Sequence, residues 1–222
     1  MTGKAHFWIS AILCQFIAVI LFKDLSAAPF IIGAICGLIA DIDEDQSKIS
    51  YMLIKGFGGK KRIKDVNYHK TDVKYNARIK LKRRIALSTL LIFSGLIMFL
   101  IFKLNIFLSL VLFYIAYLPW TVHRTLSHSL FSSLVIGCLS TIGLNQYNLT
   151  IYGIYIGIGY FLHIFEDMFT ISGVPLLYPF SKKRYKIPLM STGTTKGGIV
   201  ELTFILLSAA LCLITYVSAI VL

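Results

Sequence analysis

Histidine and aspartate residues that could bind metal ions lie near the ends of several apolar segments of this 222-residue chain. Charged and imidazole side chains are costly next to hydrocarbon and are usually retained there for function. Clustered histidine and carboxylate side chains are the ligands with which hydrolytic enzymes hold a metal ion. We therefore expect one to three divalent ions, with zinc favoured, and the predicted ligands are His6, Asp41, Asp43, His123, His128, His163 and Asp167.

The pair formed by His163 and Asp167 is the clearest of these motifs. The two residues are four positions apart at the end of an apolar stretch, so on a helix their side chains project from one face. Glu166 points in another direction on the same helix and is a weaker candidate. Asp41 and Asp43 follow a second apolar stretch, where like charges so close together need a cation between them. A structural His–Asp pair and a solvated helix end are the alternatives for these two motifs.

A third motif combines two histidines with an arginine. His123 and His128 are five positions apart, which places them about 140° apart on a helix, so both can reach one metal ion only from a loop or a helix start. Arg124 lies between them, and its guanidinium could stabilise negative charge on a phosphate or an oxyanion. Catalysis would also need an acidic residue to transfer a proton. We expect this residue to be Glu44 or Glu201.

These residues need a membrane-embedded framework to bring them together. Hydrophobic residues make up 57% of the chain, the mean hydropathy is +0.78, and only 14% of the residues are charged, compared with about 25% in an ordinary soluble domain. Division of the chain by the roughly 20 residues of a spanning helix predicts about seven segments. We predict one all-α domain over residues 1–222, a polytopic integral membrane helical bundle with segments at residues 7–22, 27–40, 85–102, 104–120, 129–144, 149–165 and 199–222.

The basic residues predict how this bundle is oriented. If successive segments cross the membrane in opposite directions, all of the 22 lysine and arginine residues except Lys23 and Lys103 lie on one face. Because short loops rich in lysine and arginine remain in the cytoplasm, we expect the N-terminus, the metal-binding side chains and a basic loop at residues 48–84 to be cytoplasmic. The C-terminus should emerge outside. The formal net charge of +12 favours anionic membrane lipids over nucleic acid as partners, because the basic runs adjoin a membrane segment.

The order of these motifs resembles that of the YdjM-type membrane-bound metal-dependent hydrolases, and most closely their short YvsG-like members. Members of this family usually have proline before the first aspartate and histidine after the second, where this chain has Ala40 and Glu44. The resemblance implies a metal-dependent hydrolase whose site is altered at Glu44, a residue that can still bind a metal. It covers nearly the whole chain in scattered blocks, namely residues 1–6, 41–43, 46–49, 123–129, 163–167 and 173–180, with Thr170, Thr192, Gly193 and Glu201.

The ligand order is also similar, more loosely, to that of the zinc-dependent phospholipase C group of all-helical phosphodiesterases. This similarity implies a phosphoester substrate, either a lipid phosphate or a small molecule, which is attacked by water that the metal ion activates. The alternative is a noncatalytic membrane protein that metal ions stabilise and whose basic loop recruits a cytoplasmic partner, since some relatives are described as binding a repressor protein. Transport is less favoured, because the acidic residues gather at one face rather than at mid-membrane.

Overall fold

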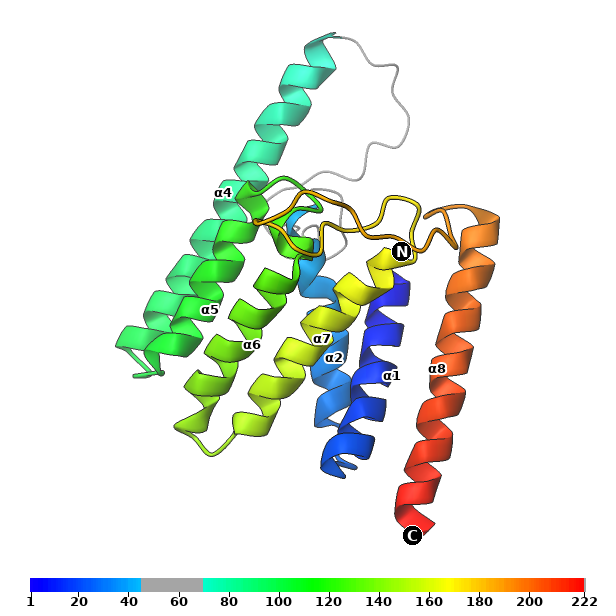
Figure 1. Ribbon diagram of the computed structural model, residues 1–222. Coiled ribbons are helices and arrows are strands. Elements are labelled where there is room, and N and C mark those ends of the chain that lie inside the picture. The colour runs from blue at the N-terminus through cyan, green and yellow to red at the C-terminus, as the bar shows by residue number, and fades with distance from the viewer. Residues whose placement is uncertain (45–69, 222) are drawn as a thin grey trace.

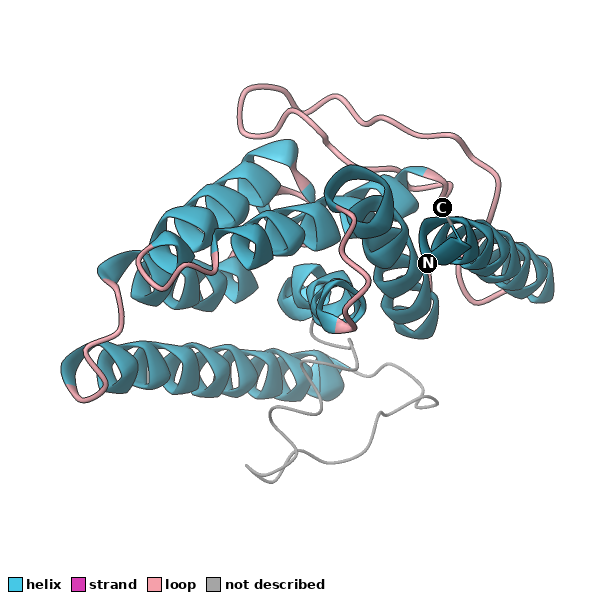
Figure 2. Cartoon of the chain, turned by 90° about the horizontal axis from the view of Figure 1, so that it is seen from below, coloured by secondary structure: helices cyan, strands magenta, loops and turns pink. Residues whose placement is uncertain are grey.

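The computed structural model describes residues 1–44 and 70–221 of the chain. These residues form seven α-helices, which loops and short 3-10 helices join. Figure 2 shows the helices and loops, without a β-strand in the described part of the chain. The predicted all-α class is confirmed. The helices are α1 (Gly3–Phe22), α2 (Ala28–Ile39), η1 (Ala40–Asp43), α4 (Lys70–Leu100), α5 (Ile106–Tyr117), η3 (Leu118–Trp120), η4 (Leu126–His128), α6 (Leu130–Asn145), α7 (Thr150–Met168) and α8 (Thr195–Val221).

Each predicted apolar segment corresponds to one of these α-helices, with shifts at the ends. The helix α1 begins at Gly3, earlier than predicted, because the side chain of Thr2 accepts a hydrogen bond from the backbone N–H of Ala5 and caps the first turn. Three helices are long and apolar enough to cross a membrane, which supports the predicted membrane helical bundle. They are three clear candidate spans, compared with the seven segments predicted. These spans are Gly3–Phe22, Lys80–Leu100 and Thr195–Val221.

The basic loop predicted at residues 48–84 is wrong for its second half. The helix α4 begins at Lys70, so residues 70–84 form the first turns of a 31-residue helix, which Figure 1 shows extending beyond the other helices. The charged residues give this stretch no apolar pattern, although lysine and arginine are good helix formers. Residues 45–69, which include the rest of the predicted loop and the family block at 46–49, lie outside the described residues.

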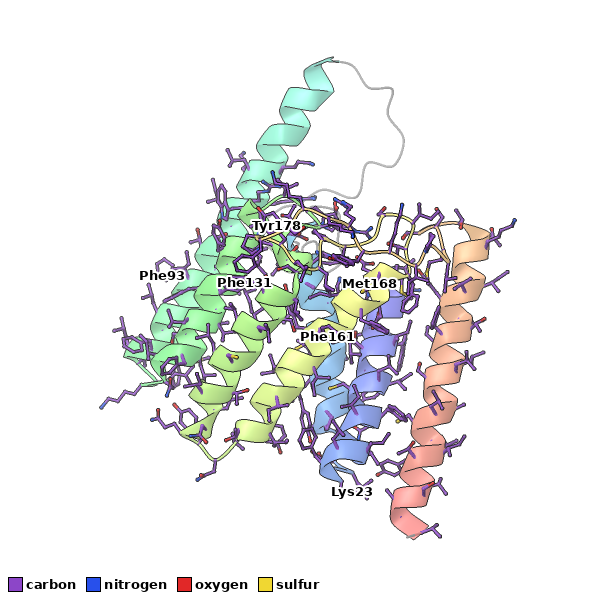
Figure 3. The ribbon with its side chains drawn as sticks, in the orientation of Figure 1. Lys23, Phe93, Phe131, Phe161, Met168 and Tyr178 are labelled. Atoms are coloured by element: carbon purple, nitrogen blue, oxygen red, sulfur yellow. The ribbon has the colours of Figure 1, made fainter. Side chains whose placement is uncertain are left out.

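The helices pack in an order that differs from their order in the sequence. The helix α4 packs against α5, α5 against α6, and α6 against α7, while α7 also contacts α1 and α2, and α1 contacts α8. The start of α1 and the ends of α2, α5 and α7 lie at one end of the bundle, which residues 169–194 cross (Figure 1). We call this the site end, and Met168 and Tyr178 mark it in Figure 3. The C-terminus lies at the opposite end.

Two glycines allow the helices that carry the site to approach each other closely. A Cβ added at Gly153 of α7 would lie 2.4 Å from the Cα of Thr141 in α6, and one at Gly37 of α2 would lie 2.6 Å from the backbone oxygen of His6 in α1. Side chains at either position would therefore push the helices apart, since protein interiors have no space to absorb such contacts. Close packing at Gly37 thus fixes α1 against α2 at the site end, and close packing at Gly153 holds the start of α7 against α6.

Apolar side chains cover the outward faces of the two outermost helices. Phe93 of α4 is 60% exposed and points away from the bundle in Figure 3. In α8, only 6% of the most apolar stretch of the helix is buried. Large exposed apolar surfaces mark contact with a membrane or another apolar partner. Lipid hydrocarbon is the surrounding that suits these faces, because α4 and α8 satisfy their backbone hydrogen bonds internally.

Candidate metal centre

All seven predicted metal ligands lie at the site end, on four separate segments of the chain. Five of the side chains are at most 2% exposed, whereas Asp41 and His123 are 19% and 32% exposed. Buried polar and charged groups are stable only with partners, so the contacts among these side chains decide what the site can bind. The ligands are His6 on α1, Asp41 and Asp43 on η1, His123 and His128 on the loop before α6, and His163 and Asp167 on α7.

Three of these residues, His6, His163 and Asp167, form a buried cluster that we call the inner group. One potential ligand atom of each lies within 4.8 Å of those of the other two. Nε2 of His6 is 3.3 Å from Oδ1 of Asp167, and the rings of His6 and His163 stack with their centroids 3.9 Å apart. The spacing of four between His163 and Asp167 places both on the face of α7 that meets α1.

Asp41, His123 and His128 form a second cluster, the outer group, which also has its ligand atoms within 4.8 Å of one another. The loop around η4, rather than a continuous helix, brings the two histidines together, as their spacing of five requires. Oε2 of Glu44 lies 3.4 Å from Nε2 of His123. Glu44 therefore adjoins the outer group.

The inner and outer groups are in direct contact. Nε2 of His128 lies 3.2 Å from Nε2 of His163 and 3.4 Å from Oδ2 of Asp167. Oδ1 of Asp41 is 3.5 Å from Nε2 of His128 and 3.6 Å from Nε2 of His163. Imidazole nitrogens and carboxylate oxygens from both groups thus surround one small region, which is the donor chemistry that zinc and similar ions require.

The same ring nitrogen of three histidines faces this region, while the other nitrogen is held from outside. A histidine that binds a metal through Nε2 characteristically has its Nδ1 fixed by a carboxylate, a carbonyl or another polar group. The arrangement is therefore typical of metal-binding histidines. The outside contacts are His6 Nδ1 with Glu166 Oε2 at 2.8 Å, His163 Nδ1 with the carbonyl oxygen of Gly37 at 2.7 Å, and His128 Nδ1 with Ser127 Oγ at 2.8 Å.

Asp43 lies beside the outer group rather than in it. Its Oδ1 is 2.8 Å from Nδ1 of His123, and its Oδ2 accepts a hydrogen bond from the hydroxyl of Ser127. The backbone carbonyl of Ser127 in turn accepts a hydrogen bond of 2.8 Å from the hydroxyl of Tyr160. The sequence predicted Asp43 as a metal ligand, and its contacts also suit orienting His123 directly and His128 through Ser127.

Glu166 and Glu201 both contact residues of the first helix or its cap. Glu166, expected to point elsewhere, is 3% exposed, accepts a hydrogen bond of 2.6 Å from the hydroxyl of Ser10 and contacts His6. A glutamate within an apolar helix, with His6 and Ser10 one turn apart on another, was the available signal. Glu201 accepts hydrogen bonds of 2.7 Å from the backbone N–H and the hydroxyl of Thr2. It therefore holds the start of α1.

Arg124 reaches the inner group from a left-handed backbone conformation, with φ of 57°. Its Nη2 lies 3.0 Å from Oδ2 of Asp167, and its Nη1 donates a hydrogen bond of 3.3 Å to the hydroxyl of Thr170. The ammonium group of Met1 lies 2.9 Å from Oδ1 of Asp167. Oδ2 is buried and lacks a hydrogen bond of suitable geometry. A buried carboxylate oxygen of this kind, aimed at His128, fits a metal ligand.

The carboxylates favour positive charge at the centre of the site. Burial disfavours the imidazolium form of His128, but its interactions with the carboxylates of Asp167 and Asp41 outweigh burial and raise its pKa to about 10. Burial alone would raise the pKa of Asp41, but interactions with His163 and His128 outweigh it and lower that pKa below its usual range. The same field that stabilises a proton on Nε2 of His128 would stabilise a divalent cation in its place.

The fold and this cluster define a helical membrane protein with a candidate metal centre. The model of the YdjM inner membrane protein family matches residues 1–221, and the chain belongs to this family. The resemblance inferred from the order of the motifs is thus confirmed. No curated protein and no solved structure matches the chain. The family and the apolar helices together indicate a membrane location.

Proposed function

We propose that the protein is a membrane-embedded, metal-dependent hydrolase that cleaves a phosphoester, most readily that of a lipid phosphate, at the cytoplasmic membrane face. The convergence of histidine Nε2 atoms and carboxylate oxygens at one end of the bundle is the observation that supports this proposal most directly. A divalent ion, with zinc favoured, activates water and polarises phosphoryl oxygens when bound to such ligands.

The residues around the cluster have distinct roles in this proposal. The imidazoles hold the ion together with Asp41 and Asp167. The side chain of Arg124 is 16% exposed, so its guanidinium can bind a phosphate oxygen beside the buried ligands and stabilise developing charge. The side chain of Glu44 is 37% exposed next to His123, where it can accept a proton from the attacking water. Glu201 acts only by holding the start of α1.

Basic and apolar side chains close to the site favour a substrate from the membrane. Residues 169–194 cross the site end (Figure 1) and carry the exposed residues Lys182, Lys183, Arg184 and Lys186. Phe180, which precedes them, is 85% exposed. Aromatic and basic side chains in such proximity suit the headgroup region of an anionic membrane. This combination supports lipid phosphate, rather than nucleic acid, as the phosphate source.

A noncatalytic role is the second candidate function, and the surroundings of Asp167 favour it. Its carboxylate already has two cationic neighbours, the ammonium group of Met1 and the guanidinium of Arg124. The cluster could therefore serve mainly to hold α1, η1, the loop before α6 and α7 together, with metal ions as a structural addition. The protein would then recruit a cytoplasmic partner through the basic residues 48–84.

Metal analysis and an activity assay on the same preparation distinguish the two functions. Protein purified in detergent with anionic phospholipid should contain zinc and release phosphate or a phosphorylated headgroup, and Asp167→Asn should lose both. Asp24→Asn is the matched control, because Asp24 accepts a hydrogen bond from Tyr155 next to Lys23, at the end opposite the site end (Figure 3). Bound zinc without hydrolysis of lipid or soluble phosphoesters would favour the noncatalytic role.

A further inference from the structure

The site offers more ligands than one zinc ion accepts. The inner and outer groups each contribute three side chains whose ligand atoms lie within 4.8 Å of one another. A hydrolytic zinc ion commonly has three protein ligands and one position open to water or substrate. Each group by itself supplies such a set, whereas a single ion would leave about half of these donors without a metal.

The carboxylate of Asp167 faces both groups. Its Oδ1 is 3.3 Å from Nε2 of His6 in the inner group, and its Oδ2 is 3.4 Å from Nε2 of His128 in the outer group. Oδ2 is also the buried oxygen that lacks a hydrogen bond of suitable geometry. Two oxygens aimed at different ligand sets suit a carboxylate shared by two ions, which in hydrolytic centres lie about 3.5–4 Å apart.

We infer that the site binds two divalent ions, one on the inner group and one on the outer group, with Asp167 shared between them. This inference rests on the metal site of the proposed function and adds the number of ions and the division of their ligands. It also assigns Glu44 a place beside the outer ion, because its Oε2 lies 3.4 Å from Nε2 of His123.

The two ions differ in their access to solvent. The inner side chains are at most 1% exposed. In the outer group Asp41 is 19% exposed and His123 is 32% exposed. The outer ion therefore exchanges faster, and a phosphate that approaches the site meets it first.

Counting the ions tests this inference directly. Protein stripped with a chelator and reloaded with zinc should contain two ions per chain by mass spectrometry of the metal, and His123→Ala should contain one. Loaded with Mn²⁺, the unmodified protein should give the electron paramagnetic resonance spectrum of an exchange-coupled pair, and His123→Ala that of an isolated ion. Asp24→Asn should keep two ions, since Asp24 pairs with Tyr155 far from both groups.

The rate of metal loss gives a second measurement, which the unmodified protein and His123→Ala both provide. Chelator added to the zinc-loaded protein should remove the ions in two phases of equal amplitude, and His123→Ala should show only the slow phase. One ion per chain, lost in a single phase, would overturn the two-ion inference and leave the proposed hydrolase standing. A protein that binds no ion would overturn both. Two ions in His123→Ala would overturn the division of ligands.

Discussion

Hydrogen-bond partners determine which nitrogen of each histidine is available to a ligand. Ser127 donates its only hydroxyl proton to Asp43, so it must accept a hydrogen bond from Nδ1 of His128. The Nδ1 atoms of His6 and His163 face oxygen atoms that only accept, so they also carry the proton. In the neutral rings the lone pair therefore lies on Nε2, the nitrogen that faces the other ligands.

Replacing Ser127 with Ala should weaken zinc binding by about 10–100-fold, the usual effect of losing a partner that orients a metal-binding histidine. The ring of His128 would keep its place in the core but lose the acceptor that fixes its orientation. Competition with a chromophoric chelator measures the affinity. Ser133→Ala is the matched control, since the hydroxyl of this buried serine donates a hydrogen bond of 3.1 Å to the backbone carbonyl of Gly157. Equal losses in both variants would contradict an orienting role for Ser127.

Replacing Arg124 with Lys should preserve bound metal and slow phosphoester hydrolysis by about a hundredfold or more, the scale expected when a preorganised donor to developing charge is lost. Lysine keeps the charge but lacks the planar fork with which Arg124 reaches Asp167 and Thr170 together. Metal content and turnover, measured on one preparation, separate the two effects. Turnover at the unmodified rate would restrict Arg124 to packing or topology.

The sequence predicted the types of site residues better than their partners. His163 and Asp167 could be paired in advance, because helix periodicity alone decides which residues of one helix are neighbours. Asp43 and Glu166 could not be assigned in this way. Their roles depend on Ser127 and Ser10, which reach them from other segments, and such contacts follow only from the packing of the helices.

At the scale of elements, hydropathy located the helices but not all of their ends. The start of α1 is decided by the cap at Thr2, a local hydrogen bond that an average of hydropathy does not register. The start of α4 at Lys70 lies among charged residues with good helix propensity, where no apolar pattern marks the helix. Neither helix start is marked by a change in hydropathy, and this explains why the predicted segments begin later than the helices.

The contact between α6 and α7 should be sensitive to a single methyl group. Gly153→Ala places a Cβ 2.4 Å from the Cα of Thr141, and overpacking of this kind costs about 1–3 kcal/mol. The thermal midpoint in detergent should fall, and zinc affinity should fall with it, since α7 carries His163 and Asp167 of the inner group. In α8, Gly198→Ala has nothing within 4 Å of the new Cβ and should leave stability unchanged or higher. Equal stability of both variants would contradict the close packing.

At the scale of the whole molecule, charge separates the two ends of the bundle. Lys23 lies at the end opposite the site end (Figure 3), and Lys103 lies in the turn between α4 and α5 at that same end (Figure 1). The sequence could predict this division of charge, because segments that cross the membrane in alternating directions assign successive loops to opposite faces. It could not predict that α7 contacts α1, α2 and α6, since contacts between distant segments depend on side-chain shape and close approach.

The charge asymmetry predicts that the site end faces the cytoplasm. In a background without the four native cysteines, Lys103→Cys should react with a membrane-impermeant maleimide added to intact cells, because Lys103 is exposed at the opposite end. Lys183→Cys, exposed at the site end, should react only after the membrane is permeabilised. Substitution of Lys183 by Arg and Lys103 by Gln leaves the asymmetry intact and provides controls for insertion. Reaction of both cysteines from one side would show that α5, α6 and α7 do not cross the membrane as an odd number of spans, and the proposed reaction at a cytoplasmic lipid phosphate would lose its basis.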